Sequence, residues 1–256
     1  MEVGEIALNC VITKKEKIKE NIFDFTVRCP EMAEKTKSGP FLHILCGGDA
    51  YLRRPISFCE VKNGEEIRFI FQVKGKGTDA LSKRGEGEVL DILGPLGNGF
   101  NINKTENYSA LVGGGIGIFP LLEAAKKLGQ KAVVLLGFRS ESDIVLLDEF
   151  KKYTDNVFAA TDDGSFGYHG LVTDLLKTAF KDYKIDMVYT CGPMPMMKAV
   201  AEVSAAAGTE ARVSLEERMG CGIGACVTCA CTVGGQRKRV CKDGPVFNAS
   251  EVEWNG

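Results

Sequence analysis

Half of the cysteines of this chain lie in one short segment, and this clustering constrains the fold more than any other feature. The sequence has 256 residues and ten cysteines, five of which fall between positions 221 and 241. Such a concentration predicts a metal centre rather than a set of disulfides. The first three cysteines follow the pattern Cys-x4-Cys-x2-Cys, which is the spacing of plant-type [2Fe–2S] sites.

A two-iron cluster needs four thiolates, so one further cysteine must join Cys221, Cys226 and Cys229. Cys231 and Cys241 are the candidates. We favour Cys241, because Cys231 follows Cys229 by two residues and would crowd the same iron. Glycines at 220, 222 and 224 would let main-chain N–H groups approach the sulfurs. The alternative is a structural zinc site, although zinc sites usually pair two closely spaced cysteine units.

The composition excludes several classes of protein. A hydrophobic content of 45%, a charged content of 26% and a net charge of −2 are ordinary globular values. The near-neutral charge argues against a nucleic-acid interface built on a basic surface. The longest uncharged apolar stretch, residues 109–122, is too short and too glycine-rich to span a membrane, and the N-terminus has no signal-peptide pattern. We therefore expect a soluble, cytoplasmic protein.

The chain is predicted to contain three domains. In residues 1–103, short β-rich segments separated by turns, the first over residues 5–12, indicate an antiparallel β-barrel, with an Asn63-Gly64 hairpin and a short helix over 78–84. In residues 104–210, apolar strands at 110–112, 131–138, 157–161 and 187–191 alternate with helices at 119–128, 143–153, 171–180 and 193–207. This alternation predicts an α/β domain with a doubly wound parallel sheet. Residues 211–256 form the predicted cluster domain.

A glycine-rich loop follows the first strand of the α/β domain and precedes a helix. Its glycines are Gly113, Gly114, Gly115 and Gly117. In that position the backbone of such a loop can approach a nucleotide pyrophosphate. The sequence departs from the G-x-G-x-x-G pattern, since Pro120 takes the place of the last glycine and Arg139-Ser140 stand where an acidic residue is usual. Tight packing of a helix on a strand would also explain the glycines.

Two motifs in the barrel region could bind an anion. Arg54-Pro55-Ile56-Ser57 places a guanidinium near the start of a strand, and Gly75-Lys76-Gly77-Thr78 opens the short helix. Taken singly, each could be a solvated arginine or an ordinary turn. A nicotinamide exchanges two electrons as a hydride, whereas an iron–sulfur cluster exchanges one, and a flavin converts between them. The cysteine cluster, the glycine-rich loop and the anion-binding motifs of the barrel together therefore predict a flavin in the barrel.

These motifs occur in the order typical of the ferredoxin–NADP reductase superfamily. Cys191-Gly192-Pro193-Met194, Asp162-Asp163-Gly164-Ser165 and the run from Leu215 to Cys226 narrow the resemblance. Over essentially its whole length the sequence resembles the electron-transfer subunits of class 1B dihydroorotate dehydrogenases. The resemblance implies an oxidoreductase subunit of pyrimidine biosynthesis that uses NAD, FAD and a [2Fe–2S] cluster.

The resemblance also implies the site residues. FAD would contact Arg54, Pro55, Ile56, Ser57, Ile70, Phe71, Gln72, Gly77 and Thr78, with Ile56 facing the isoalloxazine. The nicotinamide nucleotide would contact Gly113, Gly114, Gly115, Gly117, Cys191, Gly192 and Pro193, and the cluster ligands would be Cys221, Cys226, Cys229 and Cys241. Electrons would come from an FMN-containing catalytic subunit in a heterotetramer of two plus two chains. No residue of this chain is predicted to catalyse dihydroorotate oxidation, and His43 and His169 are interpreted as structural.

Two other functions compete with this interpretation. Small subunits of NAD(P)H–ferredoxin transhydrogenases and sulfide dehydrogenases share most of these motifs. Their first cluster ligand is typically aspartate, so Cys221 favours the dihydroorotate dehydrogenase subunit. A non-catalytic nucleotide-binding subunit with structural zinc would differ in having no visible absorption.

Overall fold

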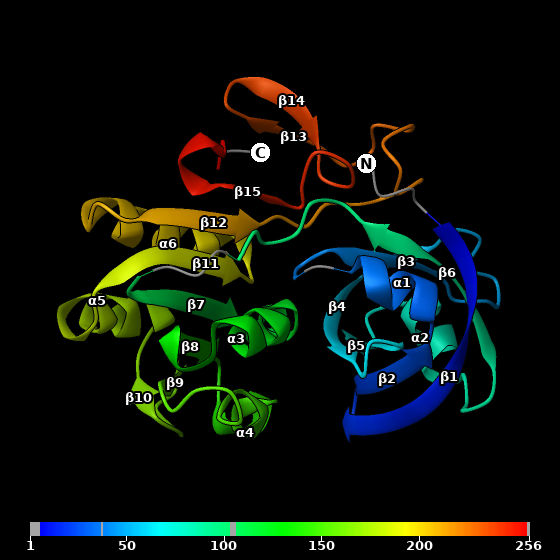
Figure 1. Cartoon of the computed structure of the whole chain (residues 1–256), viewed down its shortest axis with the longest axis horizontal. Coiled ribbons are helices and arrows are strands. Elements are labelled where there is room, and N and C mark those ends of the chain that lie inside the picture. Colours follow the sequence, from blue (N-terminus) through cyan, green and yellow to red (C-terminus); the bar gives the residue numbers. More distant parts are fainter. Residues whose placement is uncertain (1–5, 37, 103–105, 255–256) are drawn as a thin grey trace. The chain divides into compact units, whose positions relative to one another are not determined.

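The computed structural model describes residues 6–36, 38–102 and 106–254 (Figure 1). The chain divides into two compact units. The barrel unit comprises Met1–Gly99, Glu216–Ala230 and Lys238–Pro245, and the sheet unit comprises Phe100–Leu215, Cys231–Arg237 and Val246–Gly256. The cysteine-rich segment is thus shared between the units. The three-domain division stays a prediction, and its first boundary lies at residues 103–105, outside the described ranges.

Six antiparallel strands close the predicted barrel in the order β1-β2-β5-β4-β3-β6 (Figure 1). Their bounds are β1 Ile6–Lys19, β2 Ile22–Arg28, β3 Phe41–Leu45, β4 Arg54–Lys62, β5 Glu66–Gln72 and β6 Val89–Leu96. Alternate positions of these strands fill one apolar core, in which Phe25, Phe69 and Phe71 contact one another. The predicted Asn63-Gly64 turn is confirmed, with both residues at positive φ between β4 and β5.

The barrel also departs from the prediction in two places. The first strand was expected over residues 5–12; Glu5 lies outside the described residues, and β1 continues to Lys19 through register shifts. The charged run after Ile12 hides this extension, because it lacks an apolar alternation. Helix α1 (Pro30–Lys35), which starts at a proline in its first turn, was not predicted; α2 (Lys76–Ser82) was.

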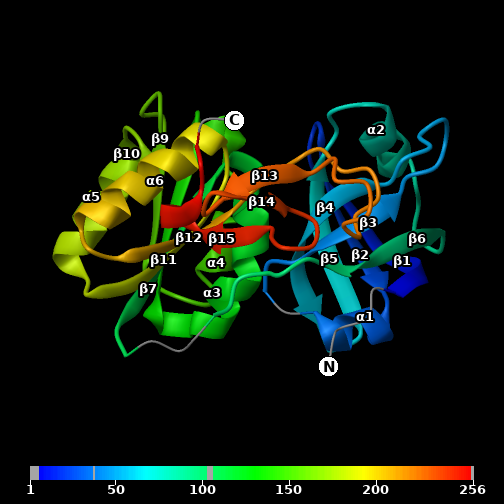
Figure 2. The same ribbon diagram turned by 90° about the horizontal axis from the view of Figure 1, so that it is seen from above.

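The sheet unit contains the predicted doubly wound sheet, with strand order β10-β9-β8-β7-β11-β12-β15 (Figure 2). The bounds are β7 Tyr108–Gly114, β8 Ala132–Phe138, β9 Val157–Thr161, β10 Tyr168–His169, β11 Ile185–Cys191, β12 Glu210–Ser214 and β15 Val246–Asn248. All neighbours are parallel except β12 and β15. Helices α5 (Val172–Asp182) and α6 (Met194–Ala206) pack together on one face, and α3 (Leu122–Leu128) and α4 (Leu147–Phe150) on the other.

Two predicted helices are shorter than expected. Residues 119–128 begin as a 3₁₀ segment, Gly115–Leu121, that contains Pro120 and precedes α3. The helix expected over 143–153 is reduced to α4, because Leu146 adopts a left-handed φ of 56° directly before it.

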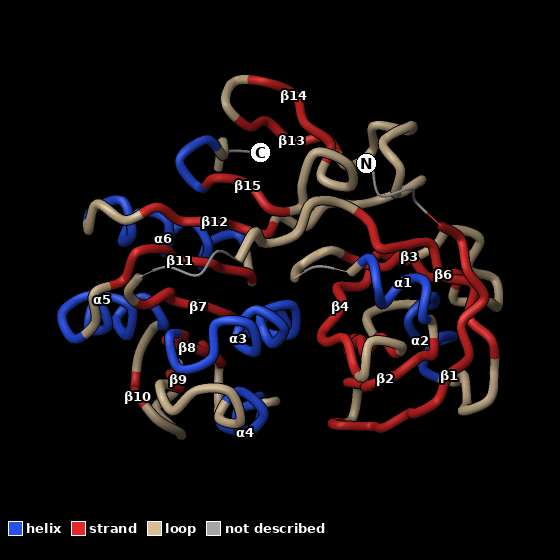
Figure 3. The backbone as a smooth tube through the Cα atoms, in the orientation of Figure 1, coloured by secondary structure: helices blue, strands red, loops and turns tan. Residues whose placement is uncertain are grey.

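A two-stranded hairpin lies between β12 and β15 in the sequence. Strands β13 (Ala230–Val233) and β14 (Gln236–Arg239) pair across Gly234-Gly235, and both glycines have positive φ (Figure 3). In the described ranges, no helix has the length and apolar character that crossing a bilayer requires.

Candidate functional site

The predicted cluster ligands lie in the barrel unit as two close pairs. The main-chain N–H of Cys221 donates to Sγ of Cys226 at 3.3 Å, and the N–H of Cys241 donates to Sγ of Cys229 at 3.4 Å. Among the described residues, no three His, Cys, Asp or Glu side chains converge as they would around a single metal ion. A [2Fe–2S] cluster needs two thiolates for each iron, which two cysteine pairs can supply.

The loop between the first two cysteines directs main-chain donors at their sulfurs. The N–H groups of Ala225 and Cys226 donate to Sγ of Cys221 at 3.2 and 3.3 Å, and the Thr228 hydroxyl donates to Sγ of Cys226 at 3.2 Å. A Cβ atom on Gly220 would lie 3.1 Å from the Cys226 sulfur. Donors of this kind stabilise thiolates and adjust the potential of a bound cluster. The loop therefore fits an iron–sulfur cluster.

The thiols of this segment have different environments. The hydroxyl of Thr228 has the largest effect on Cys226 and, together with main-chain N–H groups, lowers its pKa to about 6. Burial and the neighbouring Cys229 thiol raise the pKa of Cys241 to about 12. Cys226 is exposed, whereas Cys229 and Cys241 are each 1% exposed. A bound metal would remove the cost of ionising the buried thiols, since metal binding deprotonates cysteine. Cys231 lies in β13 and belongs to the sheet unit.

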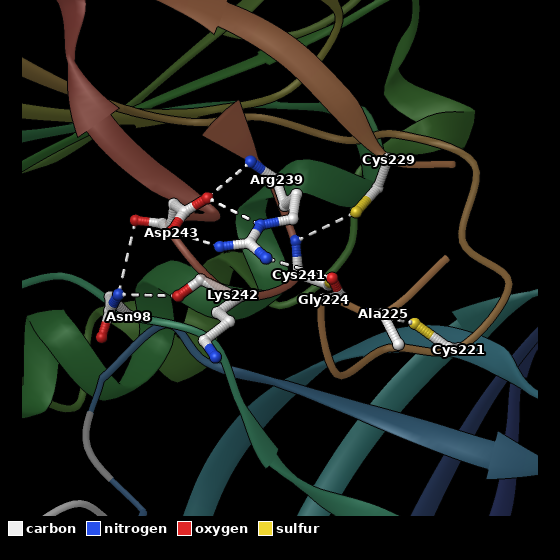
Figure 4. A network of polar contacts seen from close by, with 9 residues as sticks. All are labelled: Asn98, Cys221, Gly224, Ala225, Cys229, Arg239, Cys241, Lys242 and Asp243. Carbon is white, nitrogen blue, oxygen red and sulfur yellow. Dashed lines mark hydrogen bonds and ion pairs between the residues drawn. The ribbon is translucent and has the colours of Figure 1, made fainter. Parts of the chain in front are cut away.

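A polar network holds the two parts of this segment together (Figure 4). Arg239 donates to the carbonyl of Gly224 at 3.1 Å and pairs with Asp243 at 3.2 Å. Asn98 donates to the carbonyls of Lys242 and Asp243 at 3.1 and 3.3 Å, which ties the segment to the end of the barrel. The arginine thus joins the cysteine loop to the turn that carries Cys241.

His43, which we interpreted as structural, is fully buried against the cysteine loop. A Cβ atom on Gly222 would lie 2.6 Å from Nδ1 of His43, so only glycine fits beside the ring. Neither ring nitrogen has a hydrogen-bond partner among the described residues. Burial and the charge of Arg53 lower the pKa of His43. The main-chain groups of Arg53 and Cys221 act in the opposite direction and raise the pKa, but by less. The ring is therefore neutral near pH 7.

The two anion-binding motifs of the barrel are brought together. A Cβ atom on Gly77 would lie 2.7 Å from Nε of Arg54, so the turn before α2 adjoins the guanidinium. Arg54 donates to the carbonyls of Leu52 and Arg53 at 2.6 and 3.2 Å. Arg53 instead pairs with Asp91 at 2.6 Å. The structure pairs Arg53 within the barrel and leaves Arg54, the predicted residue, beside the turn.

Strands β4 and β5 separate where the flavin residues were predicted. Their pairing runs from Phe58 opposite Phe69 to Lys62 opposite Glu66. The segments that continue beyond it are Arg54–Ser57 (Arg54, Pro55, Ile56, Ser57) and Ile70–Gln72 (Ile70, Phe71, Gln72), which keep only the pairing on their other edges, with β3 and β2 respectively. Their facing edges keep main-chain donors and acceptors for a ligand. Ile56 and Phe71 pack in the barrel core, so a contact between the Ile56 side chain and a flavin stays a prediction.

The glycines of the nucleotide loop serve two purposes. Cβ atoms on Gly113 and Gly117 would lie 2.7 Å from Cγ2 of Ile118 and 2.5 Å from the carbonyl oxygen of Cys191. A Cβ on Gly114 would overlap the sulfur of Met196. These three glycines thus permit close packing, which was the alternative explanation. Gly115 differs, because it has a φ of 53° and open space at its Cβ position.

The loop lies where parallel sheets bind ligands. Gly113 on β7 is the register partner of Cys191 on β11, and the order of the sheet reverses between these two strands. The carboxyl ends of strands at such a switch point form the usual ligand crevice. Gly192 and Pro193 follow directly and lead into α6, so the structure gathers all predicted nucleotide residues at one place in the sheet unit.

Sequence reasoning missed the residues that support the cysteine loop. Arg239 and Asp243 are spaced four residues apart, and both flank Cys241. An ion pair beside a predicted ligand was the available signal, but its second partner, the Gly224 carbonyl, is 15 residues away. Asn98 lies more than 140 residues from its partners, so no local pattern reveals it.

Comparisons with known proteins agree with this geometry. The family model described as the iron–sulfur cluster binding domain of dihydroorotate dehydrogenase B matches residues 216–253. The oxidoreductase NAD-binding domain model matches residues 111–202. The first match contains all four predicted cluster cysteines, and the second contains the glycine loop and Cys191.

Whole-length relatives are also found. The chain is 42% identical over 251 residues to the electron transfer subunit of dihydroorotate dehydrogenase B (NAD(+)) of Clostridium perfringens (strain 13 / Type A), covering 94% of this chain and 98% of that one. The Geobacillus kaustophilus (strain HTA426) subunit is 39% identical, with 94% and 96% covered. A solved chain of the NADH-dependent reduced ferredoxin-NADP oxidoreductase, a structure concerned with flavin-based electron bifurcation, has a TM-score of 0.87 and 36% identity, with 99% and 92% covered.

Proposed function

The chain belongs to the family of electron transfer subunits of dihydroorotate dehydrogenase B, and from this we propose that it transfers electrons from an FMN-containing catalytic subunit to NAD⁺. The route runs through a [2Fe–2S] cluster on Cys221, Cys226, Cys229 and Cys241 and through FAD in the barrel. Dihydroorotate is oxidised on the partner, and two copies of each chain form the heterotetramer. The setting is pyrimidine biosynthesis in the cytoplasm.

One observation carries this proposal. The cysteine loop belongs to the same compact unit as strands β4 and β5, whose edges separate at the predicted flavin segments. A cluster and a flavin held in one unit can exchange single electrons, and the flavin supplies the conversion between one-electron and two-electron transfer. Neither feature alone would require the other.

Each group of residues has a separate task. Arg54, beside the Gly77 turn, binds a phosphate of FAD, since a guanidinium matches phosphate geometry. The open main chain at Gly115 approaches the pyrophosphate of NAD, with Cys191, Gly192 and Pro193 beside the nicotinamide. The N–H groups directed at Cys221 stabilise the charge of the cluster.

The visible spectrum of chain purified without oxygen tests the proposal. We expect flavin bands with a broad iron–sulfur shoulder, both bleached by NADH. Flavin bands without the shoulder would mean that the cluster has been lost or that the protein is a plain flavin reductase. A colourless, folded chain would contradict the proposal and favour a structural-zinc subunit.

Two cysteine substitutions test the ligand assignment. Cys226→Ala should remove the cluster and leave FAD bound, so that NADH still reduces the flavin while orotate-linked turnover with the partner stops. Cys231→Ala is the matched control and should retain the cluster. Normal turnover of Cys226→Ala, or loss of the cluster in Cys231→Ala, would refute the assignment.

A second function rests on the similarity to the NADH-dependent reduced ferredoxin-NADP oxidoreductase. In that case the chain would serve as the small subunit of a NAD(P)H–ferredoxin transhydrogenase or a sulfide dehydrogenase. Reduced ferredoxin with NADP⁺, and dihydroorotate with NAD⁺, should be compared as substrate pairs for the complex isolated with its natural partner. Turnover only with ferredoxin would select this second function.

A further inference from the structure

The outer face of strand β3 bears a buried histidine at the cysteine loop. Leu42 and Ile44 point into the barrel core, so His43 between them points away from it. A histidine on the outer face of a small barrel is normally exposed to solvent, yet His43 is 0% exposed. The cover over its ring includes Gly222, directly after the predicted first cluster ligand, Cys221.

The contact between the ring and the loop is close. Gly222 has a φ of 77°, and a Cβ atom there would lie 2.6 Å from Nδ1 of His43 and 3.1 Å from Cδ1 of Leu96. The main chain of Cys221 and Arg53 also lies against the ring and acts on its ionisation. Arg53 directly precedes the flavin segment, and Pro55 within that segment is the register partner of His43.

Both ring nitrogens are buried without a hydrogen-bond partner among the described residues. A buried polar group without a partner destabilises the fold, so its persistence needs an explanation. The main chain of Cys221 opposes the lowering of the ring's pKa, so its carbonyl oxygen is the acceptor to which a ring N–H would donate. A cluster bound by Cys221 would hold that loop in one conformation.

We propose that His43 is a positioning residue that holds Cys221 against β3, the neighbour of the strand bearing the flavin segment, by donating a ring N–H to the cysteine loop. The proposal rests on the proposed function, because it takes Cys221 as a cluster ligand. Fixing the loop also fixes the N–H groups of Ala225 and Cys226, which donate to the Cys221 sulfur. Those donors favour the more negative, reduced cluster.

His43→Phe tests this role, because phenylalanine fills the site but donates no hydrogen bond. In the full chain purified with both cofactors, we expect FAD to be retained and the EPR g values of the reduced cluster to shift. We expect the midpoint potential to fall by about 59 mV, which is a tenfold change in a one-electron equilibrium. His43→Asn keeps an N–H near the position of Nδ1 and should restore part of the difference.

Ile44→Val is the matched control on the same strand. It disturbs the barrel core without touching the loop and should leave both the potential and the EPR spectrum unchanged. Loss of the cluster with retention of flavin in His43→Phe would also support the proposal.

Two results would overturn this inference and leave the proposed function intact. The first is a wild-type potential and EPR spectrum in His43→Phe. The second is joint loss of cluster and flavin in both His43 variants, which would show that the ring only maintains the barrel. A wild-type chain without any cluster would instead overturn the proposed function, and this inference with it.

Discussion

Gly77 and Arg54 share one small volume of the barrel unit, since a Cβ atom on Gly77 would lie 2.7 Å from Nε of the arginine. The glycine comes from the start of α2 and the arginine from the start of β4. The guanidinium can therefore keep its place only if residue 77 has no side chain. Neither motif could show this dependence by itself.

Gly77→Ala should weaken FAD binding by displacing Arg54 from the turn. We expect at least a tenfold rise in the FAD dissociation constant, or about 1.4 kcal/mol. Fluorescence titration of flavin-free protein with FAD measures it. Gly75→Ala is the matched control, because position 75 has an extended backbone and no atom near its Cβ position. Equal losses in the two variants would disprove the role of Gly77.

The glycine loop predicts different results at its two kinds of position. Gly117→Ala should lower the unfolding free energy of the sheet unit by about 3 kcal/mol, because its Cβ would meet the Cys191 carbonyl at 2.5 Å. Gly115→Ala meets no atom and bears only the cost of its left-handed φ, about 1 kcal/mol. We expect its main effect to be a raised KM for NADH. Thermal unfolding and steady-state kinetics of both variants separate these outcomes.

The sequence predicted the sheet unit better than the details of the barrel. The strands of a parallel sheet are buried on both faces and appear as short apolar runs, as in β7, β8 and β11. In the barrel, β1 continues beyond residue 12 through a segment rich in Lys and Glu. This segment has no apolar alternation, so its sequence does not indicate a strand. The helix expected over 143–153 failed because Leu146 adopts a left-handed backbone that its residue type does not suggest.

The structure brings several predicted site residues together, but the residues that support them were not predicted. Arg54 and Gly77 adjoin, as do Gly113 and Cys191, because local motifs mark residues whose backbone or charge is special. Arg239, Asn98 and His43 act through partners far away in the sequence. Such partners become visible only when the strands have been placed.

Arg239→Ala should release the cysteine loop from the turn that carries Cys241. The substitution removes the hydrogen bond to the Gly224 carbonyl and leaves Asp243 without its cation. We expect the cluster to be lost in air about fivefold faster, with flavin content unchanged, as measured by decay of the iron–sulfur absorption. Arg237→Ala, on the exposed part of the same strand, should decay at the wild-type rate. Unchanged decay in Arg239→Ala would show that the ion pair does not support the site.

The Cys226 thiol should titrate far below an ordinary thiol in protein freed of its cluster. The Thr228 hydroxyl, donating at 3.2 Å, and nearby N–H groups lower the pKa of Cys226 to about 6 by stabilising the thiolate. Because thiolate is the reactive form, the rate of alkylation by iodoacetamide at Cys226 should rise through pH 6 and level off by about pH 7.

Thr228→Val tests the cause of this shift, since valine has a similar shape but no hydroxyl. Without the donor the pKa should rise toward that of a free thiol, so the midpoint of the alkylation profile should move to higher pH. Cys241 provides an internal comparison, because burial and Cys229 raise its pKa to about 12 and should keep it unreactive throughout. Peptide mass spectrometry after timed labelling resolves the two sites. A profile that is the same with and without the hydroxyl would assign the lowered pKa to the main-chain N–H groups alone, and would place control of the Cys226 sulfur in the backbone of the loop.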